Sequence, residues 1–127
     1  MPRIVMIDDD PSTLGMIEIF LKSLGWESSG SGDGVSGLGL IASAKPDVIL
    51  LDVNLPDMSG FDICSKLKDG AQTRAIPLML ISGDHKKAED ILKGLSNSRA
   101  DAYMVKPVNL MVLKAKLEAM LKPLESK

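Results

Sequence analysis

Residues 48–60 constrain the fold more than any other stretch of this 127-residue chain. The four consecutive aliphatic side chains from Val48 to Leu51 are too few for an ordinary helix and lack the alternation of a half-exposed strand. They are typical of a strand that is covered on both faces, as in the middle of a parallel sheet. Asp52 follows directly, and a segment with Asn, Pro, Ser and Gly then predicts a loop. Because the sites of open α/β sheets lie outside the carboxyl ends of the strands, Asp52 is the first candidate site residue.

The composition limits the class of protein. Hydrophobic residues make up 45% of the chain and charged residues 25%, which is usual for a globular domain, and we expect residues 1–127 to form a single domain. A net charge of -2 provides no basic surface, so direct binding of nucleic acid is not expected. No apolar run approaches the roughly 20 residues that span a bilayer. The single Cys64 permits no internal disulfide, which suits a reducing compartment. The sequence therefore predicts a cytoplasmic domain without a membrane partner.

The rest of the chain repeats a strand followed by a helix. Apolar runs at residues 4–7, 48–51, 78–81 and 100–105 predict strands, and a weaker run at 26–31, diluted by Gly and Ser, predicts an edge strand. Apolar residues at helical spacing follow each run. The side chains expected to face the core are Leu14, Ile17, Leu21 and Leu24; Val35, Leu38, Ile41 and Ala42; Phe61, Cys64 and Leu67; Ala88, Ile91, Leu92 and Leu95; and Leu110, Leu113, Leu117 and Leu121. Five such units with short loops predict an α/β fold with a doubly wound, five-stranded parallel sheet.

Polar side chains end four of the five predicted strands. They are Asp8 and Asp9 after the first strand, Asp52 after the third, Ser82 after the fourth and Lys106 after the fifth. Parallel strands bring these ends to one edge of the sheet, so the groups converge if the four strands are neighbours. Three carboxylates repel one another unless a cation lies between them, and Mg²⁺ favours one or two carboxylates, water and a phosphate oxygen. A carboxylate can itself become an aspartyl phosphate, with the lysine as a positive charge and the serine as a hydrogen-bond donor. The pattern therefore predicts a phosphorylation site.

These elements together resemble the receiver domain of two-component response regulators, including the chemotaxis regulators. The matching elements are Asp8-Asp9, the run from Leu51 to Pro56 with Gly60, Ser82, and the run from Tyr103 to Pro107. The resemblance covers nearly the whole chain, and each element falls at a predicted strand end in the right order. It implies a flavodoxin-like (βα)5 fold with strand order 2-1-3-4-5.

The resemblance also implies a role for each site residue. Asp52 would be the phosphoacceptor, with a sensor histidine kinase or a histidine phosphotransfer protein as donor. Asp9, Asp52 and the backbone carbonyl of Asn54 would bind Mg²⁺, and Asp8 would act mainly through water. Lys106 would pair with the phosphoryl group, and the peptide bond after it is commonly cis in this family.

A conformational switch would follow phosphorylation in such a domain. Ser82 would move toward the phosphoryl group, and Tyr103, which is expected to face away from Lys106 toward the fourth helix, would rotate into the vacated space. The surface of the fourth helix, fifth strand and fifth helix would then be read by a downstream protein or effector domain, and a phosphorylation-dependent homodimer is compatible with it. Such a domain is not an enzyme, since it promotes only its own phosphorylation and dephosphorylation.

Two other functions stay open from the sequence. Asp8-x-Asp10 matches the motif after the first strand of haloacid-dehalogenase-like phosphatases, in which Asp8 would be the nucleophile. That interpretation leaves Asp52 unexplained and finds few acids after Lys106 to hold the metal. The other alternative is a receiver-like interaction module that is never phosphorylated, although such domains usually lose an acid or the lysine.

Residues 32–37 formally match a dinucleotide-binding fingerprint, Gly32-x-Gly34-x-x-Gly37. The preceding strand is weak, however, and no catalytic partner accompanies the motif. The simpler interpretation is a loop that leads into a helix weakened by Gly37 and Gly39.

Overall fold

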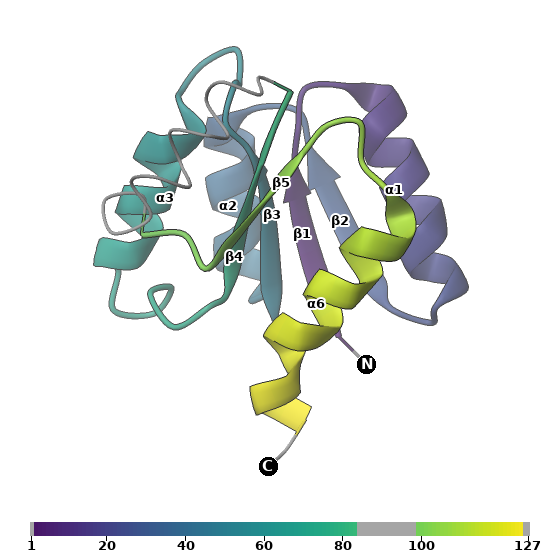
Figure 1. Cartoon of the computed structure of the whole chain (residues 1–127). Helices are drawn as coiled ribbons and strands as arrows, with labels where there is room; N and C mark the ends of the chain where they lie inside the picture. The colour runs from purple at the N-terminus through teal and green to yellow at the C-terminus, as the bar shows by residue number, and fades with distance from the viewer. Residues whose placement is uncertain (1, 84–98, 126–127) are drawn as a thin grey trace.

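The computed structural model of the chain describes residues 2–83 and 99–125. Five parallel strands form one sheet in the order β2-β1-β3-β4-β5 (Figure 1). The strands are β1 (Arg3–Ile7), β2 (Glu27–Ser31), β3 (Val48–Asp52), β4 (Leu78–Ser82) and β5 (Ala102–Val105). The helices in the described ranges are α1 (Pro11–Ser23), α2 (Gly34–Ala44), α3 (Gly60–Asp69) and α6 (Leu110–Glu125). The predicted α/β fold and strand order are confirmed, whereas the predicted fourth helix, with Ala88, Ile91, Leu92 and Leu95, lies outside the described residues.

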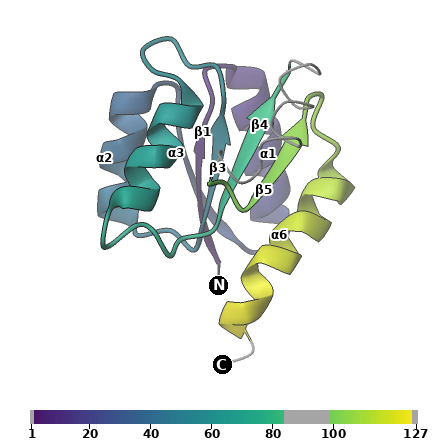
Figure 2. The ribbon, with the colours of Figure 1, turned by 60° about the vertical axis from the view of Figure 1, so that its left-hand side comes forward.

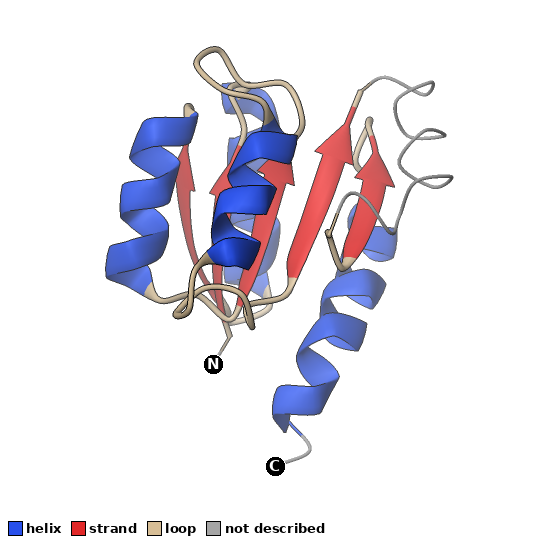
Figure 3. Ribbon diagram, turned by 90° about the vertical axis from the view of Figure 1, so that its left-hand side faces the viewer, coloured by secondary structure: helices blue, strands red, loops and turns tan. Residues whose placement is uncertain are grey.

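The helices cover both faces of the sheet. α1 and α6 lie on one face, and α2 and α3 lie on the other (Figures 2 and 3). One apolar core joins β1, β3 and β4 to α1 and α6, and a second core joins the other face of these strands to α2 and α3. All four aliphatic residues from Val48 to Leu51 are at most 1% exposed. The uninterrupted apolar run is therefore explained by burial on both faces of the sheet, as predicted.

Side-chain caps fix where the helices begin. The side chains of Asp10, Ser59 and Asn109 each accept a hydrogen bond from the backbone amide two residues later, at the start of α1, α3 and α6 respectively. A cap of this kind contributes about 1 kcal/mol because it satisfies an amide that has no partner within the helix. Local side chains therefore fix the first turn of these three helices.

The inward face predicted for α2 is wrong in part. Val35 is 69% exposed and Ala42 is also exposed, whereas Gly37 is buried beside Ile41. A Cβ atom on Gly37 would lie 2.5 Å from Cδ1 of Ile7, so the missing side chain lets α2 approach β1 closely. The sequence predicts only that Gly37 weakens this helix. The structure shows that Gly37 also determines how closely α2 packs on the sheet.

The edge of the sheet follows the prediction more closely. β2 is the outer strand beside β1, as expected for a run diluted by Gly and Ser, and it begins at Glu27. At the opposite edge, β5 begins at Ala102, later than predicted. No helix in the described part of the chain is long and apolar enough to cross a membrane.

Candidate functional site

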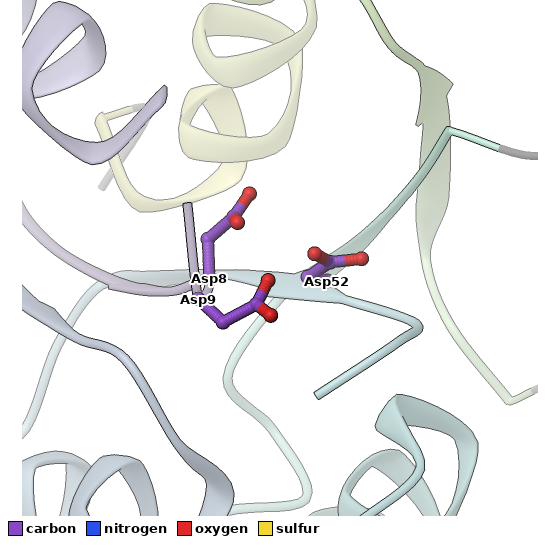
Figure 4. A group of neighbouring side chains, drawn as sticks. All are labelled: Asp8, Asp9 and Asp52. Carbon is purple, nitrogen blue, oxygen red and sulfur yellow. The ribbon is translucent and has the colours of Figure 1, made fainter. Parts of the chain in front are cut away.

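The carboxyl ends of β1 and β3 bring three carboxylates together. Ile7 pairs with Leu51 in the parallel register, so Asp8 and Asp52 leave neighbouring strands at the same level. One carboxylate oxygen from each of Asp8, Asp9 and Asp52 lies within 4.8 Å of the others (Figure 4). Asp8 and Asp52 are each 4% exposed, whereas Asp9 is exposed. The predicted convergence of the acids is confirmed.

Lys106 brings a positive charge to this cluster from the end of β5. Its Nζ lies 2.9 Å from Oδ2 of Asp8 and 3.2 Å from Oδ2 of Asp52. The Lys106–Pro107 peptide bond is cis, as the family resemblance implied. One ammonium group thus contacts two of the three carboxylates, which leaves the cluster with an excess of negative charge when all three acids are ionised.

The pKa values reflect this imbalance. Burial raises the pKa of Asp52, the charge of Asp8 raises it further, and these effects outweigh the hydrogen bond from the Asn54 amide and the attraction of Lys106. Burial alone would lower the pKa of Lys106, but its contacts with Asp8 and Asp52 outweigh that effect and raise the pKa. The lysine therefore stays charged, while the ionised form of Asp52 is held at a cost in free energy.

The donor set suits a small divalent cation. Three carboxylate oxygens that converge from two strand ends are hard ligands of the kind that Mg²⁺ prefers. A bound cation would also offset the repulsion that raises the pKa of Asp52. The residues present therefore fit a Mg²⁺ ion.

Asp10 does not join this cluster. Its carboxylate accepts hydrogen bonds from the Thr13 hydroxyl at 2.8 Å and from the Ser12 amide at 3.0 Å, and these bonds lower the pKa of Asp10. A side chain that caps α1 in its ionised form is a poor proton donor. Asp10, the second acid of the Asp8-x-Asp10 motif, therefore serves as the cap of α1.

Ser82 and Asn54 border the cluster. Ser82 ends β4, is 1% exposed, and accepts a hydrogen bond from the Lys106 amide through its backbone oxygen at 2.8 Å. Asn54 lies two residues after Asp52, and its amide donates to Oδ1 of Asp52 at 3.1 Å. Both residues are therefore held at the edge of the sheet where the acids meet.

Tyr103 lies farther from the acids. It pairs with Leu80 in the register of β4 and β5 and packs, partly buried, against the core between the sheet, α2 and α3. Met104 faces the opposite core, which is the alternation expected along a strand. The predicted orientation of Tyr103 toward the fourth helix concerns residues outside the described ranges.

Sequence reasoning missed Asp57, in the loop after β3. Its carboxylate accepts hydrogen bonds from the backbone amides of Gly34 at 2.7 Å and Val35 at 3.0 Å, and these two bonds lower the pKa of Asp57. The preceding Pro56 marks it only as a turn residue. No local signal could have identified its partner, because the first turn of α2 lies far away in the sequence.

Comparisons with known proteins agree on one family. The model described as "Response regulator receiver domain" matches residues 4–118. The DNA-binding dual master transcriptional regulator RpaA of Synechocystis sp. is 34% identical over 122 residues, which are 96% of this chain and 50% of that protein. Response regulator PleD of Caulobacter vibrioides is 36% identical over 118 residues, which are 93% of this chain and 26% of that protein. The crystal structure of a two-component response regulator from Clostridium difficile is similar with a TM-score of 0.86 and 30% identity, covering 96% of this chain and 97% of that one. The chain thus spans half or less of the length of these two curated relatives.

Proposed function

Because the chain belongs to the response regulator receiver domain family, we propose that Asp52 accepts a phosphoryl group in a Mg²⁺-dependent reaction. The donor is a sensor histidine kinase or a histidine phosphotransfer protein. The observation that carries the proposal is the buried Asp52 carboxylate, which has two further carboxylates within 4.8 Å and the Lys106 ammonium at 3.2 Å. An acid in this setting can serve as nucleophile beside groups that stabilise negative charge.

The transfer forms one bond and breaks one. An oxygen of Asp52 attacks the phosphorus, and the bond from phosphorus to the imidazole nitrogen of the donor breaks. The nitrogen keeps the bonding electrons and takes up a proton. Mg²⁺, held by Asp9, Asp52 and the Asn54 carbonyl with Asp8 acting through water, would neutralise the phosphoryl oxygens. Lys106, already in contact with Asp52, pairs with a phosphoryl oxygen once the group arrives.

The output follows from the position of β5 beside the site. The Ser82 side chain moves so that its hydroxyl donates to a phosphoryl oxygen. The ring of Tyr103, which is half-buried on the neighbouring strand, then rotates into the space that Ser82 leaves. This rotation alters the surface around β5, which a downstream protein or an effector domain recognises. Residues 1–127 thus act as one cytoplasmic signalling domain and not as an enzyme with a separate substrate.

Acetyl phosphate tests the phosphorylation without a cognate kinase. With Mg²⁺, intact mass spectrometry should detect one phosphoryl group per wild-type chain, removed by hydroxylamine and absent in EDTA. Asp52→Asn should not be labelled, whereas equal labelling of this variant would refute the assignment. If Asp8→Asn abolished turnover of a phosphoester, the phosphatase alternative would be supported. A wild-type chain that gains no phosphoryl group from acetyl phosphate or from phosphorylated kinases would favour the interaction module.

A further inference from the structure

The loop between β3 and α3 is closed at its base. The Gly60 amide donates to the Val53 oxygen at 2.7 Å, and Asn54 pairs with Ser59 in an isolated antiparallel bridge. A Cβ atom on Gly60 would collide with the backbone oxygen of Asp52, so this loop returns directly over the phosphoacceptor. Asn54 therefore lies at the base of the loop and Asp57 near its tip.

The tip of the loop is fastened to α2. The Asp57 carboxylate accepts hydrogen bonds from Gly34 and Val35, the first two residues of that helix, at 2.7 Å and 3.0 Å. The helix has its own cap, Asp33, whose carboxylate accepts from the amide and hydroxyl of Ser36 at 2.8 Å and 3.1 Å. The two acids thus satisfy different amides of the first turn, one from the N-cap position just before the helix and one from the loop.

Gly34 makes a second contact with the same loop. A Cβ atom on Gly34 would lie 2.7 Å from Sδ of Met58 and 2.9 Å from Cδ1 of Ile63, so the missing side chain is what allows Met58 to rest on the helix. Gly34 is also part of the glycine pattern that resembles a dinucleotide fingerprint. Since its amide already binds Asp57, the pattern is explained by loop docking and requires no nucleotide.

We propose that Asp57 is a positioning residue for the phosphorylation site. Its two bonds to the first turn of α2 fix the loop that presents the Asn54 carbonyl, so that Mg²⁺ binding and the order of this turn are coupled. Glycine is a poor helix former, and Gly34 lies in the first turn of α2. The helical conformation of this turn therefore depends on its bonds to the loop. Coupling of this kind is reciprocal: losing the loop contact weakens Mg²⁺ binding, and Mg²⁺ stabilises the turn. The inference rests on the proposed function because the metal concerned is that of the Asp52 site.

Isothermal titration of Mg²⁺ tests the coupling. Asp57→Ala loses both bonds and should raise the Kd for Mg²⁺ by about threefold to tenfold, below the 10- to 100-fold effect of partners that bond a ligand directly. Asp57→Asn keeps one acceptor oxygen and should give an intermediate Kd. Asp33→Ala is the matched control, since it removes an acid from the same helix end but leaves the bonds between the loop and α2 in place, and it should raise the Kd much less than Asp57→Ala does.

Amide hydrogen exchange gives a readout that does not depend on affinity. Mg²⁺ should slow exchange at Gly34 and Val35 in the wild-type protein and have no such effect in Asp57→Ala. If Asp57→Ala and Asp33→Ala raised the Kd equally, or if neither did, the positioning role would be overturned while the proposed function stood. Asp57→Asn provides the same comparison if thermal unfolding shows that Asp57→Ala does not fold. A wild-type protein that binds no Mg²⁺ would overturn the proposed function itself.

Discussion

Replacing Asp52 with asparagine is expected to stabilise the metal-free fold at neutral pH. Asp52 is 4% exposed and lies beside Asp8, Asp9 and Lys106. Burial and the charge of Asp8 raise its pKa, so ionisation of this side chain costs the folded protein free energy. Asp52→Asn removes the charge and nearly preserves the shape, including an oxygen that can accept the bond from the Asn54 amide.

The expected gain can be worked from the distances in the cluster. With an effective dielectric constant of about 20, like charges 4.8 Å apart repel by about 3.5 kcal/mol and opposite charges 3.2 Å apart attract by about 5 kcal/mol. Repulsion from Asp8 and Asp9 counted in full at 4.8 Å exceeds the attraction of Lys106 by about 2 kcal/mol, whereas repulsion from Asp8 alone falls short of it, so the burial of Asp52, the largest cause of its raised pKa, decides the sign. Solvent screening of the exposed Asp9 reduces the difference, and burial of the Asp52 charge adds to it. We expect the free energy of unfolding to rise by about 1–3 kcal/mol and Tm to rise by about 4–11 °C.

Urea denaturation in EDTA, followed by circular dichroism, measures this gain. Glu18→Gln is the charge-matched control, because it neutralises an exposed acid on α1 and should change stability little. Added Mg²⁺ should stabilise the wild type more than Asp52→Asn, so the difference between their free energies of unfolding should become smaller. A variant less stable than the wild type in EDTA at neutral pH would show that the attraction of Lys106 outweighs the repulsion.

The pH dependence gives the same prediction a second check. The folded-state pKa of Asp52 lies above its value of about 3.9 in the unfolded chain, so the folded state binds this proton more tightly. Wild-type stability therefore gains from protonation of Asp52 below about pH 3.9 and loses that gain as the pH rises through the higher folded-state pKa. The difference in free energy of unfolding between Asp52→Asn and the wild type should therefore grow as the pH rises over this range. A difference that does not change with pH would show that the raised pKa of Asp52 is not its cause.

Four further perturbations test the charge, packing and switching effects separately. Lys106→Met should lower the free energy of unfolding in EDTA by about 2–4 kcal/mol, because it leaves a buried acid without its cation, and an unchanged urea midpoint would contradict this. Gly37→Ala should destabilise by about 1–2 kcal/mol, because its Cβ would lie 2.5 Å from a side chain of β1. Gly39→Ala, with no atom within 4 Å of the added Cβ, should stabilise by about 0.5–1 kcal/mol, and equal shifts in the Tm of the two variants would refute the packing argument. Beryllofluoride, a phosphoryl mimic, should shift amide resonances in residues 82–95 and 100–105, whereas changes confined to the loops after β1 and β3 would rule out the switch.

The hydrogen bond from Ser82 is not expected to drive the switch by itself. Moving an equilibrium from 1:99 to 99:1 requires about 5.5 kcal/mol of differential affinity. A charge-assisted hydrogen bond from Ser82 supplies about 1.5–3 kcal/mol. Either the active conformation is already partly populated without phosphate, or Lys106 and the metal contribute most of the remainder.

The sheet and its acidic edge could be predicted because the signals are local. A fully buried strand appears in the sequence as an unbroken apolar run, and parallel strands place whatever follows at one edge. The run before Asp52 and the acids after β1 therefore predicted both the core and the convergence seen in the structure. Lys106 follows the same logic at the end of β5.

The packing of α2 and the role of Asp57 could not be predicted in this way. Hydrophobicity placed Val35 inside, although it is 69% exposed, because a buried glycine contributes no apolar signal. Gly37 matters through the side chain that occupies its space, and Asp57 through amides of a distant helix. The packing of Gly37 and the hydrogen bonds of Asp57 both depend on how α2 lies against the rest of the fold. The residues next to each of them in the sequence do not indicate which residue it will contact.

The position of the phosphorylated residue distinguishes Asp52 from the two neighbouring acids. After reaction with acetyl phosphate and Mg²⁺, borohydride reduction converts an aspartyl phosphate to homoserine, which tandem mass spectrometry of the digested protein identifies by position. Homoserine is expected at Asp52 alone. Homoserine at Asp8 or Asp9 with Asp52 intact would contradict this expectation.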